Sequence, residues 1–152
     1  MVPMIPIEIL VAEDDRTDAY FLNEVFIRSG IQANIKFVRD GQEAVWYLKG
    51  EKEFSDRTAN PFPQILLLDL KMPRMDGFDV LDWIRGQAQC RRLKIIVLSS
   101  SAELQDIDRA YDLGASSYLT KPTGAPAMVD MVRRLKEYWL ELNRFPQRVV
   151  TE

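Results

Sequence analysis

Acidic residues follow two apolar segments of the chain, and together they could bind a divalent cation. Asp69 follows the apolar run 65–68, and Glu13 and Asp14 follow the apolar run 7–12. Alone, Asp69 is more simply explained as a turn residue that hydrogen-bonds to nearby backbone amides. If both runs are buried strands, however, their ends bring three carboxylates to one place. An all-oxygen set without cysteine or histidine suits Mg²⁺, which binds carboxylates together with waters and phosphate oxygens.

Ser99 and Lys121 supply the groups that a phosphoryl site would need beside such a cluster. Ser99 follows the apolar run 95–98, and its hydroxyl can hydrogen-bond to a phosphoryl oxygen. Lys121 adds a positive charge, which would offset the repulsion of about 4 kcal/mol between like charges about 4 Å apart at an effective dielectric near 20. Ser99 could instead begin a helix cap, and Lys121 could be an exposed loop residue. Their joint placement after separate strands favours a phosphoryl-binding site.

The elements that must position these residues follow a repeating pattern. Short β-type segments alternate with longer amphipathic ones, as in a parallel sheet with helices on both faces. The predicted strands are 7–12, 34–38, 65–69, 94–98 and 117–119, and the first, third and fourth are almost wholly apolar, as central parallel strands should be. The pattern predicts a doubly wound α/β fold with a five-stranded parallel sheet and five helices. Ligands of such sheets bind beyond the carboxyl ends of the strands, where all these site residues fall.

Helix signals lie between the predicted strands. Thr17 is the predicted N-cap of the first helix, which carries Leu22, Val25 and Phe26 on its inward face and which Gly30 can close. Periodic apolar residues mark the next three helices. Ala44, Val45 and Leu48 mark the second, which ends at Gly50, and the spacing of Phe78, Leu81 and Ile84 gives the third one inward face. The fourth carries Leu104, Ile107, Ala110 and Tyr111 and stops at Gly114.

The fifth helix is predicted to run from about Pro126 to Leu142, because proline suits a first helical turn. It carries an apolar stripe that we expect to pack on the sheet, formed by Met131, Leu135, Trp139 and Leu142. With Tyr138 beside Trp139, some aromatic surface could remain for self-association.

Length and charge describe one domain without a nucleic-acid surface. The 152 residues with 47% hydrophobic content suit a single domain over residues 1–152, with a core of about 7–142 and a short C-terminal tail. Segment 51–64 lacks periodicity and is predicted to be an exposed loop, either a tolerated insertion or a partner contact. The net charge of -3 argues against nucleic-acid binding, and the basic residues near 91–94 and 133–136 are more simply solvated faces.

Cysteine and histidine content excludes several kinds of site. Cys90 is the single cysteine, so no intramolecular disulfide can form, and the absence of histidine excludes a His-based metal site or catalytic triad. Residues 1–6 lack the layout of a signal peptide, and no apolar stretch approaches the roughly 20 residues needed to cross a bilayer. We therefore expect a cytoplasmic protein without a membrane partner.

These residues resemble the receiver domains of two-component response regulators, over roughly residues 7–142. The motifs stand in that family's order: Glu13-Asp14, Asp69 with Met72-Pro73 and Asp76-Gly77, Ser99 after 95–98, and Lys121-Pro122. The resemblance implies a single receiver domain with the flavodoxin-like strand order 2-1-3-4-5. Two further features resemble the stand-alone regulators that partner bacterial phytochrome histidine kinases: the long loop before Pro63, and the ending Tyr138-Trp139-Leu140 followed by Phe145-Pro146.

The resemblance implies a role for each site residue. Asp69 would be the phosphoacceptor, which takes a phosphoryl group from the phosphohistidine of a sensor kinase, and Lys121 would pair with that group. Asp14, Asp69 and the main-chain carbonyl of Lys71 would hold Mg²⁺, with Glu13 acting through water. Many relatives carry a smaller or neutral side chain at the position of Lys71, but a main-chain ligand survives this substitution.

The resemblance also implies a switch and a dimer. Ser99 would move toward the phosphoryl group, and Tyr118 matches an aromatic position that turns inward as the hydroxyl leaves. From the residues alone, Tyr118 could equally be an ordinary, partly buried strand aromatic. The Lys121-Pro122 bond is a family site for a cis peptide, which only X-Pro bonds adopt at modest cost. Regulators of this subgroup dimerise through the fourth helix, fifth strand and fifth helix, so a homodimer is expected.

Two other functions fit these residues less well. A magnesium-dependent phosphatase with an Asp nucleophile would need a second acid two residues after Asp69, where this chain has Lys71. A nucleotide- or flavin-binding domain would need a glycine-rich or hydroxyl-rich phosphate loop after the first strand, where this chain has acidic residues. We therefore expect a signalling protein rather than an enzyme, with Mg²⁺ as its only cofactor.

Overall fold

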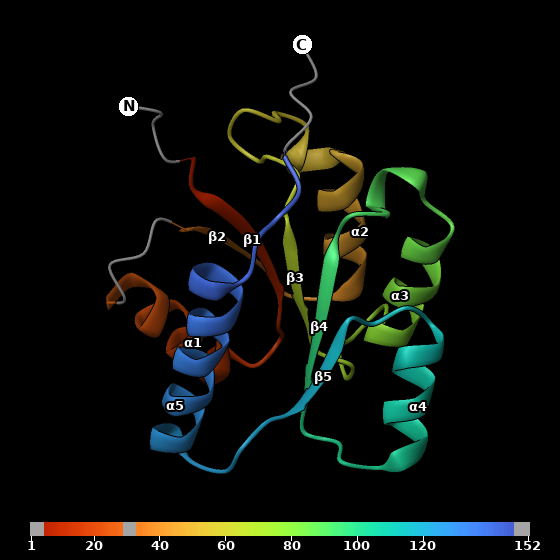
Figure 1. Ribbon diagram of the computed structural model, residues 1–152. Coiled ribbons are helices and arrows are strands. Elements are labelled where there is room, and N and C mark those ends of the chain that lie inside the picture. The colour runs from red at the N-terminus through yellow and green to blue at the C-terminus, as the bar shows by residue number, and fades with distance from the viewer. Residues whose placement is uncertain (1–4, 29–32, 148–152) are drawn as a thin grey trace.

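The computed structural model describes residues 5–28 and 33–147, which form one parallel sheet with helices on both faces (Figure 1). Its strand order is β2-β1-β3-β4-β5, which confirms the predicted doubly wound, flavodoxin-like α/β fold. The strands are β1 (Ile7–Ala12), β2 (Ala33–Val38), β3 (Ile65–Leu68), β4 (Lys94–Ser99) and β5 (Ser117–Thr120).

Five α-helices connect and cover these strands. They are α1 (Arg16–Arg28), α2 (Gly41–Lys49), α3 (Gly77–Arg85), α4 (Leu104–Asp112) and α5 (Ala125–Lys136), and a π-helical turn, η3 (Glu137–Leu142), continues α5. Short 3₁₀ turns, η1 (Lys52–Phe54) and η2 (Ala88–Cys90), lie before β3 and β4. Helices α1 and α5 cover one face of the sheet, and α2, α3 and α4 cover the other (Figure 1). None of the described helices combines the length and the apolar character needed to cross a membrane.

The central strands are buried on both faces because their side chains alternate between two cores. In β1, Leu10 packs in the core beneath α2, α3 and α4, whereas Ile9 and Val11 pack in the core beneath α1 and α5. The chain leaves β1 toward β2 on one side and returns to β3 on the other. This reversal of strand order places a crevice at the carboxyl ends of β1 and β3, where the acidic residues follow.

The start of α1 differs from the prediction. Thr17 is not the N-cap, because the Asp15 carboxylate accepts hydrogen bonds from the backbone N–H groups of Thr17 (2.9 Å) and Asp18 (3.0 Å). One carboxylate thus satisfies two amides of the first turn, and the helix begins at Arg16. The predicted end at Gly30 lies outside the described residues. By contrast, α2 ends as predicted, with Gly50 in the left-handed conformation at φ 71°.

Helix α4 buries less than its pattern indicated. Ala110 is fully buried, but Leu104 is 76% exposed and Tyr111 is 47% exposed, so not all the residues that mark this helix in the sequence lie on its buried face. Because α4 lies beside the edge strand β5, only the side of the helix that carries Ala110 meets the core (Figure 1). Leu104 and Tyr111 are therefore left on the exposed side of α4, among polar and charged residues.

The end of the last helix is also corrected by the structure. Met131, Leu135 and Trp139 pack against the core as predicted, but Leu142 is 74% exposed. The backbone N–H of Asn143 donates to the carbonyl of Tyr138, five residues earlier, at 2.7 Å. This wider turn changes which side chains face the sheet, so that Leu140 packs there.

Segment 51–64 packs against the domain more closely than an exposed insertion would. Phe54 and Phe62 pack against the core, and the Arg57 guanidinium donates hydrogen bonds to three carbonyls: those of Tyr47 (2.7 Å), Leu48 (2.7 Å) and Asn60 (3.0 Å). The segment is therefore attached to α2 by both apolar and polar contacts.

Candidate functional site

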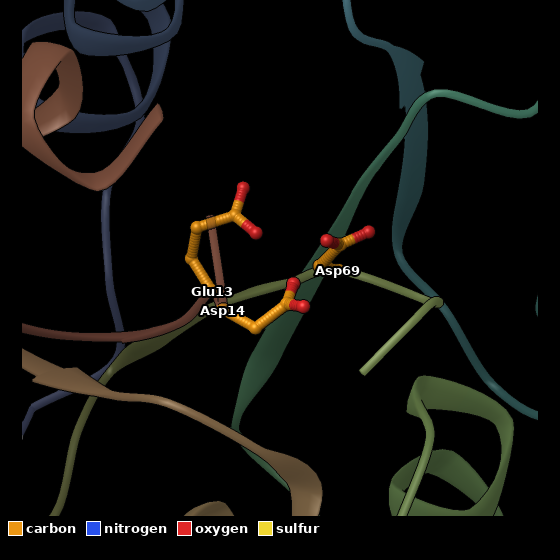
Figure 2. A group of neighbouring side chains, drawn as sticks. All are labelled: Glu13, Asp14 and Asp69. Atoms are coloured by element: carbon orange, nitrogen blue, oxygen red, sulfur yellow. The ribbon is translucent and has the colours of Figure 1, made fainter. Parts of the chain in front are cut away.

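The three predicted acidic residues meet at the carboxyl ends of β1 and β3. The pairing of Ala12 with Leu68 brings the next residues of both strands side by side, and the Asp69 N–H donates to the carbonyl of Ala12 at 3.1 Å. Carboxylate oxygens of Glu13, Asp14 and Asp69 lie within 4.8 Å of one another (Figure 2). Adjacent parallel strands thus deliver the acidic cluster that the sequence predicted.

Burial and mutual repulsion make it harder to ionise this cluster. Glu13 and Asp69 are buried, whereas Asp14 is exposed. Burial, together with the neighbouring Asp69 carboxylate, raises the pKa of Glu13 to about 8. Desolvation and the charge of Asp69 also raise the pKa of Asp14. Both pKa shifts arise first from desolvation and then from the Asp69 carboxylate, and a bound cation would favour the ionised carboxylates.

Lys121 provides the positive charge within the site. Its ammonium lies 2.5 Å from Oε1 of Glu13, 2.8 Å from Oδ2 of Asp18 and 3.3 Å from Oδ2 of Asp69. Burial alone would lower the pKa of Lys121, but its hydrogen bonds with Asp18 and Glu13 outweigh this effect and hold the pKa above the usual range. The backbone N–H of Lys121 donates to the carbonyl of Ser99 at 2.7 Å, which ties the end of β5 to the end of β4. Lys121 is therefore charged and fixed among the acids.

Asp18 is a member of the site that the sequence reasoning missed. It lies in the first turn of α1, the helix that follows the Glu13-Asp14 pair. The available signal was an acid at the start of a helix that begins at the same edge of the sheet. Acids are common there for another reason, because the helix dipole favours negative charge at its N-terminus.

The loop from Asp69 to Gly77 is shaped by its Asp-Gly motif. Asp76 is the N-cap of α3 and forms a capping box with Asp79, in which each side chain accepts from the other residue's backbone N–H. A Cβ at Gly77 would lie 2.4 Å from the Asp69 carbonyl oxygen, so the loop approaches the end of β3 more closely than a side chain allows. The Lys71 N–H lies 3.4 Å from Oδ1 of Asp69, and the Lys71 side chain is exposed.

Ser99 and Tyr118 are linked through one residue, Ser101. The Ser99 side chain is fully buried, and its hydroxyl oxygen accepts from the Ser101 N–H at 3.1 Å. The Tyr118 hydroxyl donates to the Ser101 carbonyl at 2.8 Å. Helix α4 begins only at Leu104, so Ser99 is not its cap. A movement of Ser99 and Tyr118 on phosphorylation stays a prediction, but the two side chains already share a hydrogen-bonded neighbour.

The prediction of a cis bond between Lys121 and Pro122 is wrong. No cis peptide occurs among the described residues, so this bond is trans. The trans isomer is the form that X-Pro bonds favour intrinsically, by about 0.5–1 kcal/mol.

The donor atoms fit a hard divalent cation. Carboxylate oxygens alone form the cluster, and Cys90 is buried in η2, where desolvation raises the pKa of its thiol to about 11. Mg²⁺ and Mn²⁺ prefer such oxygen ligands, whereas zinc sites usually contain thiolate or imidazole. The residues present therefore suit magnesium, with Asp14 accessible from solvent.

Comparison with known proteins finds one family for this chain. The sequence profile described as the response regulator receiver domain matches residues 9–133. FilR2 of Methanothrix harundinacea, named a probable methanogenesis regulatory protein, is 35% identical over 93% of this chain and 88% of its own. The response regulator Rcp1 of Synechocystis sp. is 32% identical over 93% of this chain and 94% of its own.

Two solved structures share the fold along most of the chain. The Mn²⁺-bound form of Rcp1 has a TM-score of 0.87 and 32% identity, over 93% of this chain and all of that one. The phosphorylated form of RcpA, described as a cyanobacterial phytochrome response regulator, has a TM-score of 0.88 and 31% identity, over 94% of this chain and all of that one. The acidic cluster of this chain is consistent with a divalent-metal site of the same kind.

Proposed function

Because this chain belongs to the response regulator receiver domain family, we propose that it is a stand-alone signalling protein that accepts a phosphoryl group on Asp69. The donor is the phosphohistidine of a sensor histidine kinase. One observation carries the assignment of Asp69: its buried carboxylate lies 3.3 Å from the Lys121 ammonium and within 4.8 Å of the carboxylate oxygens of Glu13 and Asp14. Residues 1–152 are proposed to act as a single receiver domain.

The proposed step is a displacement at phosphorus. An Asp69 carboxylate oxygen bonds to the phosphorus, the bond between phosphorus and the imidazole nitrogen breaks, and the nitrogen keeps the electron pair. The Lys71 N–H and the Lys121 ammonium contact different oxygens of Asp69, which orients the carboxylate. Lys121 then pairs with the new phosphoryl group. Such transfer depends mainly on positioning and charge stabilisation, which these residues provide.

Magnesium is the proposed cofactor. Asp14, Asp69 and the main-chain carbonyl of Lys71 are assigned as its ligands, and Glu13 acts through a water. When bound, the cation neutralises charge on the oxygens of the transferring phosphoryl group. The same acids repel one another and carry raised pKa values at Glu13 and Asp14, which supports a cation at this position.

The proposed switch begins at Ser99. When its hydroxyl moves toward the phosphoryl group, the Ser101 N–H loses its acceptor, and the loop before α4 rearranges. Tyr118 bonds to the carbonyl of the same Ser101, so the change reaches β5. Phosphorylation at Asp69 would in this way alter the surface formed by α4 and β5.

The kinase partner is proposed to be of the phytochrome type. RcpA, which is described as a phytochrome response regulator, supports this choice through similarity along nearly the whole chain. FilR2 is at least as similar in sequence and carries a different regulatory name, so a transfer assay must decide the partner. We expect phosphoryl transfer from an autophosphorylated bacteriophytochrome kinase within minutes, and transfer only from unrelated kinases would contradict this part of the proposal.

A homodimer through α4, β5 and α5 is also proposed. Leu104 and Tyr111 lie seven residues apart, on one side of α4, and both are exposed. Tyr138, in the turn after α5, is 54% exposed. Sedimentation with and without a phosphoryl mimic tests this, and a monomer under both conditions would contradict it. The cytoplasmic location stays a prediction.

The test of the phosphoacceptor assignment uses a small phosphodonor. Purified protein incubated with acetyl phosphate and Mg²⁺ should gain the mass of one phosphoryl group, and Asp69→Asn should gain none. Chelation of the metal should abolish the gain in the wild-type protein. An equal gain in Asp69→Asn would refute the assignment, and sustained turnover of added phosphate esters would favour the phosphatase alternative.

A further inference from the structure

Asp18 forms a close ion pair with Lys121, the lysine that also contacts the proposed phosphoacceptor. Its Oδ2 lies 2.8 Å from the Lys121 ammonium, closer than the 3.3 Å between that ammonium and Asp69. The pair is largely shielded, since the Lys121 side chain is 10% exposed and the Asp18 side chain is 22% exposed. The Lys121 ammonium therefore lies closer to Asp18 and Glu13 than to Asp69.

The backbone position of Asp18 is fixed by the start of α1 rather than by Lys121. Its backbone N–H donates to the carboxylate of Asp15 at 3.0 Å, within the first turn of the helix. A negative charge is also favoured there by the helix dipole. The backbone of Asp18 is thus held by the helix start, independently of Lys121.

Asp18 differs from the other two partners of Lys121 in its relation to the metal cluster. Glu13 and Asp69 belong to the group of acids that could hold a cation, and Asp18 does not. A cation in the cluster would satisfy the charge of Glu13 and Asp69, whereas Lys121 is the only cation that contacts Asp18 among the described ion pairs. The ion pair between Asp18 and Lys121 is therefore the one that we expect to persist after a metal ion binds.

We propose that Asp18 competes with the phosphoryl group for Lys121 and thereby limits how tightly the phosphorylated site is held. This inference rests on the proposed function of Asp69. A lysine ammonium has three donor hydrogens, and three carboxylates already contact the ammonium of Lys121. A phosphoryl oxygen can therefore pair with Lys121 only if one of these contacts weakens. Asp18 is a positioning residue in this account, because it acts through Lys121.

The test compares Asp18→Asn with two matched variants, using beryllofluoride at saturating Mg²⁺ as the phosphoryl mimic. Asp18→Asn keeps the size of the side chain but removes its charge, and beryllofluoride should bind about twofold to fivefold more tightly, as expected for the loss of one ion pair near the surface. Glu24→Gln removes a charge from the same helix at the Arg28 pair, 3.3 Å apart, and should leave the affinity unchanged. Asp18→Glu restores the charge and should return the affinity toward that of the wild type.

A second readout separates competition from a general loss of structure. The affinity for Mg²⁺ alone, measured by calorimetry, should fall in Asp18→Asn because the site loses a negative charge, while the affinity for beryllofluoride rises. Disruption of the site would weaken both. If Asp18→Asn does not fold, Asp18→Ser, which suits a first helical turn, takes its place with the same expectation.

The outcomes distinguish this inference from the proposed function. If wild-type protein binds beryllofluoride and Asp18→Asn binds it equally or more weakly, the competition is refuted and the role of Asp69 is unaffected. If the wild-type protein binds none, the proposed function fails, and the inference fails with it.

Discussion

Replacement of Lys121 by methionine should make the stability of the protein depend on magnesium. The substitution keeps most of the side-chain volume but removes the charge between Glu13 and Asp69, whose side chains are only 2% and 8% exposed. Removal of one partner from a buried ion pair typically costs about 3–5 kcal/mol. Because the pKa of Glu13 is already raised to about 8, a proton can replace part of the lost charge, so we expect about 3 kcal/mol.

For a protein of this size, that loss corresponds to a fall in Tm of about 6–12 °C. Thermal unfolding at pH 7.5, followed by circular dichroism, would measure it in the presence of a chelator and in millimolar Mg²⁺. Magnesium should raise the Tm of Lys121→Met by more than it raises that of the wild type, since the cation restores positive charge to the same acids. Lys71→Met is the matched control, because its side chain is exposed and should affect neither value strongly.

An unchanged Tm of Lys121→Met in chelator would refute this reasoning, since it would mean that the acids do not need the lysine. An equal effect of magnesium on both proteins would refute the second part. In that case the cation and Lys121 would not share the same carboxylates.

The remaining predictions concern the loop, the titration of the cluster and the segment before β3. Gly77→Ala should destabilise the protein by about 2–4 kcal/mol and slow phosphorylation, because its Cβ would lie 2.4 Å from the Asp69 carbonyl oxygen; Gly86→Ala, whose nearest contact is 3.6 Å, should be nearly neutral in denaturant unfolding. The affinity for Mg²⁺, measured by calorimetry, should rise as the pH increases from 4.5 toward 8, because the cation displaces the proton of Glu13. Over the same pH range the stability of the metal-free protein should fall, because the pKa of Glu13 is about 8 in the folded state and 4.5 ordinarily, so the folded state binds the proton more tightly. A flat pH profile would contradict both expectations. Arg57→Ala should lower stability by about 2–3 kcal/mol, since three carbonyls lose a charged donor, and should increase proteolysis within residues 51–64; unchanged proteolysis would contradict it.

The sequence was sufficient for the parts of the site that depend on strand ends. Asp69 and Glu13 could be placed together because fully apolar runs mark central parallel strands, and the residues that follow such strands meet at one edge. Ser99 and Lys121 follow from the same rule, since each terminates a strand of that sheet or follows it directly.

The parts that the sequence missed depend on side-chain direction and on helix geometry. Asp18 reaches Lys121 from the first turn of a helix, where an acid is also expected for its effect on the helix dipole alone. Leu142 continues the apolar spacing of α5, but the π-helical turn changes the period, and spacing counted at 3.6 residues cannot register that change. Leu104 fits the apolar spacing of α4, but only the side of the helix that carries Ala110 meets the core, and Leu104 is exposed.

The most direct test of Asp69 as the phosphoacceptor is to locate the phosphoryl group in the phosphorylated protein. Protein phosphorylated with acetyl phosphate and Mg²⁺ would be reduced with borohydride, which converts an aspartyl phosphate to homoserine, and the peptides would be sequenced by mass spectrometry. We expect homoserine at position 69 and at no other aspartate, with none when the metal is chelated. Homoserine at Asp14 or at another acid, with residue 69 unmodified, would contradict it.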